Sequence, residues 1–334
     1  MARKKAHAVV LKVNCDDGDL NSLVKRLPKT YKYKHKDKIG LSENDFINET
    51  YTYTWEKNFT TRSISVEDGD TLTFLMATAR IEFQRKVKFR DGVILPRDER
   101  INVNQPDVIL FMADNVAYMA VITSYLPDVE RVAKLVGEDE IEAISQDDQL
   151  TDSFFVWVYY HFQKKLNILP SLNLNNITGF TGIVSDPTNT IIGNSDNTAD
   201  LIITKAFVSN KNPLKSLKLD LLDGVMATLM VLSENREVTI DVKATDFLLS
   251  EEYSEEKKIL NAIAYVYINL LPKLLIKYES ESTNFQDQNR SFSKEIGLDV
   301  IESIVRLNDI SMGDLLQKLS LHESQMHSEA KIAK

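Results

Sequence analysis

Residues 106–123 read Pro106-Asp-Val-Ile-Leu-Phe-Met-Ala-Asp-Asn-Val-Ala-Tyr-Met-Ala-Val-Ile-Thr123, two apolar runs on either side of Asp114 and Asn115. Asp and Asn tolerate a positive φ better than other non-glycine residues, so the stretch predicts a tight β-hairpin. Because both runs are apolar at nearly every position, we expect both faces of the hairpin to be covered and the hairpin to lie centrally in its sheet. No side chain in it is an obvious catalyst.

A helix is predicted directly after this hairpin. Pro127 and Asp128 are typical of the first turn of a helix, and the apolar residues that follow recur at helical spacing. The predicted buried face carries Val129, Val132, Leu135 and Val136.

Strand-like patterns dominate the rest of the first part of the chain. A short helix is predicted at 20–27, and strands are predicted at 7–14, 31–38, 51–61, 62–66 and 71–90. In the last of these, period-two alternation places Ile81, Phe83, Val87 and Phe89 inward. We therefore expect an N-terminal domain over residues 1–140, a mixed β-sheet with few helices.

The acidic stretch 137–149 is the predicted boundary to a second domain over residues 141–334. The second domain should begin with a buried aromatic helix at 152–163, in which His161 is expected to be a core histidine. Strands are predicted at 180–184, 190–193, 200–208, 214–222, 225–232 and 237–243, the last three forming an antiparallel β-meander. The C-terminal part is predicted to be helical, over 259–276 (kinked or ended at Pro272), 292–308 and 311–321. The predicted fold class is therefore α+β.

Composition limits the class of protein and its compartment. The chain of 334 residues has a net charge of −9, yet residues 1–100 carry +5 and residues 101–334 carry −14. A basic first third on an acidic body indicates an anionic partner for that third, although local unevenness alone also gives such a distribution. The single cysteine, Cys15, fits a reducing cytoplasm. No signal peptide is evident, and the apolar stretch 259–276 contains enough polar residues to be a buried helix, so we expect a cytoplasmic protein.

Cationic side chains alternate along two of the predicted strands, with Tyr31 and Tyr33 interleaved. They are Lys32, Lys34, Lys36, Lys38, Arg80, Lys86, Lys88 and Arg90. Distributed cations of this kind bind a phosphate backbone. The alternative is that they are edge-strand lysines, which prevent unwanted strand pairing. Arg85, on the otherwise apolar face, is instead expected to form a buried pair.

A second pattern would belong to an enzyme. Asp223, followed at a distance by Asp241-Val242-Lys243, resembles the acids and lysine of PD-(D/E)xK nucleases, in which the acids hold Mg²⁺. The same pattern also occurs in any half-buried strand. The stretch His322 to His327 is one residue too long for the zinc motif HExxH, so we exclude a metalloprotease site. The chain contains no GxGxxG, Walker A or GxSxG motif.

The order of elements over residues 106–137, an apolar strand, an acidic turn, a second apolar strand and a short helix ending in glycine, resembles RexA-like and KwaB-like phage-exclusion and phage-defence proteins. The antiparallel meander and C-terminal helices that follow are similar in layout. The resemblance implies a cytoplasmic, oligomeric, sequence-tolerant DNA-binding protein that works with a membrane-bound partner encoded alongside. It matches no individual DNA-contacting residue onto this chain.

The leading prediction is thus a non-enzymatic effector of antiviral defence that binds double-stranded DNA as a homo-oligomer and needs no cofactor or metal. Oligomerisation is expected through the C-terminal helices. One alternative is a Mg²⁺-dependent nuclease that uses Asp223, Asp241 and Lys243. The other is a scaffold subunit of a defence complex, which the acidic body would suit.

Overall fold

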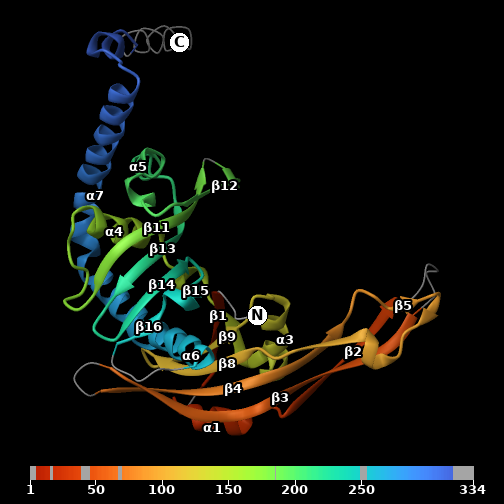
Figure 1. Ribbon diagram of the computed structural model, residues 1–334. Helices are drawn as coiled ribbons and strands as arrows, with labels where there is room; N and C mark the ends of the chain where they lie inside the picture. Colours follow the sequence, from red (N-terminus) through yellow and green to blue (C-terminus); the bar gives the residue numbers. More distant parts are fainter. Residues whose placement is uncertain are drawn as a thin grey trace, which may run out of the picture.

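The hairpin expected at residues 106–123 lies in the middle of a long antiparallel sheet (Figure 1). Its strands are β8 (Asp107–Ala113) and β9 (Val116–Ile122), and the turn places Asp114 at φ 50° and Asn115 at φ 61°. Two successive left-handed residues are what a two-residue hairpin turn requires, so this prediction is confirmed. The computed structural model describes residues 5–15, 18–38, 46–66, 70–184, 186–248 and 254–318.

The remaining strands are distributed along the whole chain. They are β1 (Lys5–Val13), β2 (Thr30–Lys38), β3 (Phe46–Ser65), β4 (Thr71–Gln84), β5 (Phe89–Arg90), β6 (Val93–Ile94), β7 (Ile101–Asn104), β10 (Ile141–Ala143), β11 (Asn173–Val184), β12 (Asp186–Asn194), β13 (Leu214–Leu222), β14 (Met226–Ser233), β15 (Val238–Asp241) and β16 (Asp246–Phe247). The main sheet has the order β12-β11-β13-β14-β15-β1-β9-β8-β4-β3-β2, while β5 and β6 form a separate ribbon.

Helices and short turns connect these strands. The α-helices are α1 (Leu20–Arg26), α2 (Arg97–Arg100), α3 (Pro127–Val136), α4 (Asp152–Gln163), α5 (Ile202–Ser209), α6 (Glu255–Tyr265) and α7 (Leu271–Leu307). Short 3₁₀ turns lie at Glu138–Glu140, Gln146–Asp148, Thr198–Asp200 and Val242–Ala244. Residues 312–318 are also helical, whereas the end of the predicted helix 311–321 and the stretch from His322 to His327 lie outside the described residues.

Both faces of the central hairpin are covered, as its composition predicts. On one face Phe111, Tyr118 and Ile122 pack in a large core with α4, α6 and α7. On the other, Leu110 and Met119 pack in a second core with α1 and α3. Helix α3 buries the four apolar residues predicted for its inner face, so that prediction is confirmed. The α+β class is confirmed as well.

All strand pairs among the described residues are antiparallel, so the first part of the chain does not show the mixed pairing that we predicted. Parallel pairs need a crossover segment, whereas β8 and β9 are joined by a two-residue turn. Strand β1 pairs with β9 on one side and with β15 on the other, so the sheet runs continuously across residue 140. The division into two domains at that residue stays a prediction.

Two predicted strands differ from the structure. The strand expected at 71–90 ends at Gln84, because its partner at that end, β7, begins at Ile101, directly opposite Gln84. Val87 and Phe89, expected inward, are 63% and 40% exposed. The strand expected at 200–208 is the helix α5, which buries Thr204, Phe207 and Val208 at helical spacing. Burial against α7 outweighs the β propensity of its Ile-Ile-Thr segment.

The C-terminal helix was expected to kink or end at Pro272, but α6 and α7 form one continuous helical segment through it. One turn of π-helix at Val266–Leu270 joins them. It lies just before Pro272, which has no backbone N–H to donate. Among the described residues, this segment is the one helix long and apolar enough to cross a membrane. Two thirds of its most apolar window, 67%, is nevertheless buried within the fold, as in a core helix.

The aromatic helix α4 packs along this segment. His161 is 5% exposed, and its Nε2 lies 3.0 Å from Oε2 of Glu281 on α7. Burial lowers the pKa of His161, although the neighbouring Glu281 carboxylate acts in the opposite direction. His161 is buried in the core as predicted, but its Nδ1 has no hydrogen-bond partner among the described residues, so the histidine is only partly satisfied.

The left-handed turn of the central hairpin gives a first testable prediction. Asn115→Val should lower the free energy of unfolding by about 1–2 kcal/mol, because a β-branched residue is strained at positive φ. Asn115→Gly should lower it little or not at all, since glycine adopts this conformation freely. Urea unfolding of both variants measures the difference, and equal stabilities would contradict the role assigned to this turn.

Candidate nucleic-acid interface

The register of three strands decides which cations share a face. Thr54 of β3 lies across from Thr30 of β2 on one side and from Arg80 of β4 on the other. Residues opposite one another in neighbouring strands point to the same side of the sheet, and so do alternate residues of one strand. Lys32, Lys34 and Lys36 are therefore on the same side of the sheet as Arg80.

Two β-bulges add further cations to this side. From Trp55 to Lys57, β3 advances by two residues while its partner β4 advances by one. The register shifts again between Lys57 and Thr60. The first bulge turns Lys57, which lies opposite Thr78, to the side that carries Arg80. The second bulge returns the even-numbered residues of β3 to that side. Arg62, which lies opposite Phe74, therefore also points to the side that carries Arg80. Strict alternation would have placed Lys57 on the other side.

We call the resulting surface the basic face. It consists of Lys32, Lys34, Lys36, Lys57 and Arg62, all of which are exposed. None of the ion pairs found between described residues involves any of these five. Lys36 places its ammonium 4.7 Å from the ring centre of Phe46, itself 38% exposed on the same side. The basic face thus combines unneutralised cations with an accessible aromatic ring.

The opposite side of β2 and β3 is covered by protein. Tyr51 and Tyr53 are buried there in the core that includes α3, and Lys134 of α3 lies 5.0 Å from the ring of Tyr33. Because α3 occupies this side, a large ligand can approach these strands only from the basic face.

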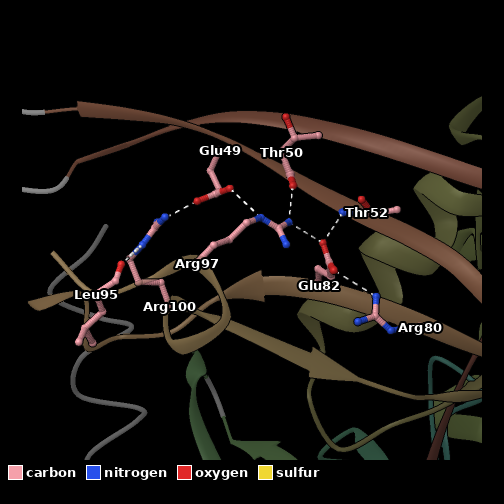
Figure 2. A network of polar contacts seen from close by, with 8 residues as sticks. All are labelled: Glu49, Thr50, Thr52, Arg80, Glu82, Leu95, Arg97 and Arg100. Atoms are coloured by element: carbon pink, nitrogen blue, oxygen red, sulfur yellow. Dashed lines mark hydrogen bonds and ion pairs between the residues drawn. The ribbon is translucent and has the colours of Figure 1, made fainter.

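Beyond Tyr53 and Ile81, strands β3 and β4 separate, β3 continuing with β2 and β4 with β7. A network of charged side chains, of which Glu49, Glu82 and Arg100 are buried, connects them there (Figure 2). Glu49 of β3 accepts from Arg97 Nε at 3.1 Å and from Arg100 at 2.8 Å, and Glu49 and Arg100 are 7% and 6% exposed. Arg97 also donates to the carbonyl of Thr50 at 2.8 Å. Helix α2 is thereby bonded to β3.

Glu82 of β4 completes this network. Its Oε2 accepts from Arg97 at 2.9 Å and from the backbone N–H of Thr52 at 3.0 Å, and its Oε1 accepts from Arg80 at 3.1 Å. Burial by itself raises the pKa of Glu82, but the hydrogen bonds from Arg97, Thr52 and Arg80 outweigh it and hold the pKa below its ordinary value. Arg80, predicted to bind phosphate, is thus already paired.

The other predicted basic residues do not join the basic face. Lys38 lies in β2 at the matching register, but its side chain is outside the described residues. Lys86 and Lys88 follow the end of β4, outside the sheet, and Arg90 pairs with Glu99 at 3.1 Å. Arg85 is exposed and donates to Asn102 at 2.8 Å, so the buried pair predicted for it is wrong.

The structure does not bring the predicted nuclease residues together. The carboxylate of Asp223 accepts the backbone N–H groups of Val225 and Met226 at 2.8 and 2.7 Å and the hydroxyl of Tyr265, on α6, at 2.6 Å. It therefore faces the side of the sheet that α6 covers.

Asp241 alternates with buried Ile240 and faces the other side of the sheet, where it accepts the backbone N–H of Lys243 at 3.0 Å. The two carboxylates thus lie on opposite faces, and each closes a local turn. No group of three or more potential metal ligands of the His, Cys, Asp and Glu types is found in the part of the chain that the structure describes.

Comparison with known proteins adds little. No protein-family model matches the chain, and no curated protein matches it in sequence. Among solved structures, it is similar to the di-domain ARO/CYC StfQ from the steffimycin biosynthetic pathway, at 8% identity over 87% of this chain and 98% of that chain. The TM-score of 0.16 is too low to support an argument about fold or function.

The buried pair of Glu49 and Arg100 gives a second prediction. Glu49→Ala should lower the free energy of unfolding by about 3–5 kcal/mol, because it leaves a buried guanidinium without its counter-charge. Glu56→Ala, at a carboxylate that is 45% exposed, is the control and should cost less than about 1 kcal/mol. Denaturant unfolding of both variants tests this, and similar losses would show that the buried network does not stabilise the fold.

Glu82 gives a prediction about pH. Its depressed pKa means that its stabilising contribution is present above the unfolded glutamate value of about 4.3 and is lost as the pH falls through the folded value. Glu82→Gln should therefore be less stable than the parent protein at pH 7, and the difference should shrink below about pH 4.3. Urea titrations at pH 7, 5, 4 and 3 test this, with the exposed Glu138→Gln as control. A difference that does not vary with pH would refute the assignment.

Proposed function

We propose that the protein is a cytoplasmic, non-enzymatic DNA-binding effector of phage defence that holds the phosphate backbone on the basic face. The observation that carries this proposal is the concentration of five exposed, unneutralised cations on one open face of a chain whose net charge is −9. Such a surface attracts a polyanion and releases its counterions on binding.

The arrangement of the cations favours an extended ligand over a small anion. Lys32, Lys34 and Lys36 follow one another along β2 at a spacing of about 7 Å, two strand residues each. Lys57 and Arg62 continue the basic face along β3. Lysines contact phosphates without reading base identity, which fits sequence-tolerant binding of double-stranded DNA.

Oligomerisation would strengthen this binding, and the outer end of α7 offers a surface for it. Leu298, Ile301 and Ile304 recur there at spacings of three residues and are 57%, 49% and 41% exposed. An apolar stripe exposed at helical spacing is typical of helix pairing. Linking several basic faces would raise the avidity for one DNA molecule. The role in phage defence and the membrane-bound partner rest on the resemblance of residues 106–137.

A Mg²⁺-dependent nuclease is not favoured, because Asp223 and Asp241 face opposite sides of the sheet. A scaffold that binds no DNA is the alternative which the following experiment distinguishes.

Fluorescence anisotropy on a labelled duplex, titrated with salt, tests the proposal. Replacing Lys32, Lys34 and Lys36 together by Gln should weaken binding and reduce the slope of log affinity against log salt by about 2–3, since each phosphate contact contributes about 0.9. The matched control replaces Lys243, Lys273 and Lys294, three exposed lysines elsewhere, and removes the same charge.

The control variant should bind like the parent protein. Equal losses in both triple variants would mean that net charge alone governs binding and would contradict the assigned surface. Absence of binding by the parent protein at low salt would refute the DNA-binding function and leave the scaffold. The same samples run on a gel with Mg²⁺ report any cleavage, which would contradict the non-enzymatic assignment.

A further inference from the structure

A groove of about 740 Å³ lies between β3 and the beginning of α6. Pockets of about 300–1,000 Å³ are typical of small-molecule and cofactor sites. Lys57 and Arg62 line this groove and also belong to the basic face, so the two surfaces are continuous. The apolar side chains of Phe74 and Met76 also line it.

Asn261 is the unusual residue of this groove. It lies on α6, is 5% exposed, and lines the groove, yet its side-chain amide forms no hydrogen bond with any residue that the structure describes. The amide atoms are not fully buried, so they contact solvent in the groove and are not left unsatisfied within the core. The amide offers both a donor and an acceptor to whatever enters the groove.

The electrostatics of the groove favour an anion. Helix α6 begins here with Ser254, whose Oγ accepts the backbone N–H of Lys257, and the N-terminus of a helix attracts negative charge. Lys57 and Arg62 supply two positive charges to the lining of the groove, and Glu256 also lines it. Cations and an amide are two kinds of contact that a nucleotide makes, through its phosphate and through the edge of its base.

We propose that this groove receives an unpaired nucleotide of a DNA strand whose paired part lies on the basic face. Lys57 and Arg62 bind its phosphate, and the amide of Asn261 pairs with the edge of its base. This inference rests on the proposed function and refines it: the preferred substrate is DNA that carries unpaired nucleotides rather than a fully paired duplex.

The test compares two labelled duplexes of equal paired length in anisotropy titrations, one blunt and one with a three-nucleotide single-stranded overhang. The parent protein should bind the overhang duplex about tenfold more tightly, a difference that one added phosphate contact and one hydrogen bond to the base can supply. Asn261→Leu should bring this affinity down to that of the blunt duplex and leave blunt-duplex binding within about twofold of the parent. Since the amide of Asn261 bonds to no residue that the structure describes, this nearly isosteric change should not lower the melting temperature.

A second variant blocks the groove without touching the core. Thr60 is exposed and lines the groove, so Thr60→Trp should abolish the preference for the overhang in the same way. Equal affinity of the parent protein for both duplexes would overturn the inference while leaving the proposed function intact. A preference for the overhang duplex that persists in both Asn261→Leu and Thr60→Trp would overturn the inference as well. Absence of binding to either duplex would overturn the proposed function, and this inference with it.

Discussion

The strands β8 and β9 are apolar on both sides, and a buried strand must have its backbone groups paired and both faces covered. Strand β1 pairs with β9 and β4 with β8, so the hairpin has a neighbour on either edge. One face is closed by the long helix of α6 and α7, and the other by α1 and α3. The position of every layer of the molecule follows from covering this hairpin.

Helices do not cover both faces of the sheet where its strands extend beyond the core. Strands β2 and β3 run past the core, with α3 on one side and the basic face open on the other. There β3 and β4 separate, and ion pairs rather than apolar side chains connect them. Glu49 and Glu82 each accept from Arg97, so a single guanidinium joins the two branches. A wholly apolar contact would be less directional, whereas planar guanidinium groups hold the branches in one geometry.

Neither carboxylate of this network neutralises the basic face. Glu49 lies across from His35, on the side of β2 and β3 that carries Tyr51 and not Lys34, and Glu82 is already occupied by Arg80 and Arg97. The network therefore stabilises the split and at the same time leaves the lysines of β2 available for an external anion.

Part of this interface could be read from the sequence. The alternation of Lys32, Lys34 and Lys36 predicted a strand with one basic side, and β2 has that side exposed. Lys57 was missed, because the two bulges that turn it to the basic face depend on how β3 pairs with β4. Lys86 and Lys88 were wrongly placed on a strand, because the end of β4 depends on where its partner β7 begins.

The local sequence alone determined the elements whose reasons are local: the left-handed turn at Asp114 and Asn115, the start of α3 at Pro127, the burial of α4 and the α+β class. These depend on backbone sterics, helix signals and apolar periodicity, which neighbouring residues carry. Only the tertiary structure decided the bulges of β3, the pairing of Arg97 with Glu49 and Glu82, and the separation of Asp223 from Asp241. Each of these depends on which strand or helix lies alongside, and such contacts join residues far apart in the chain.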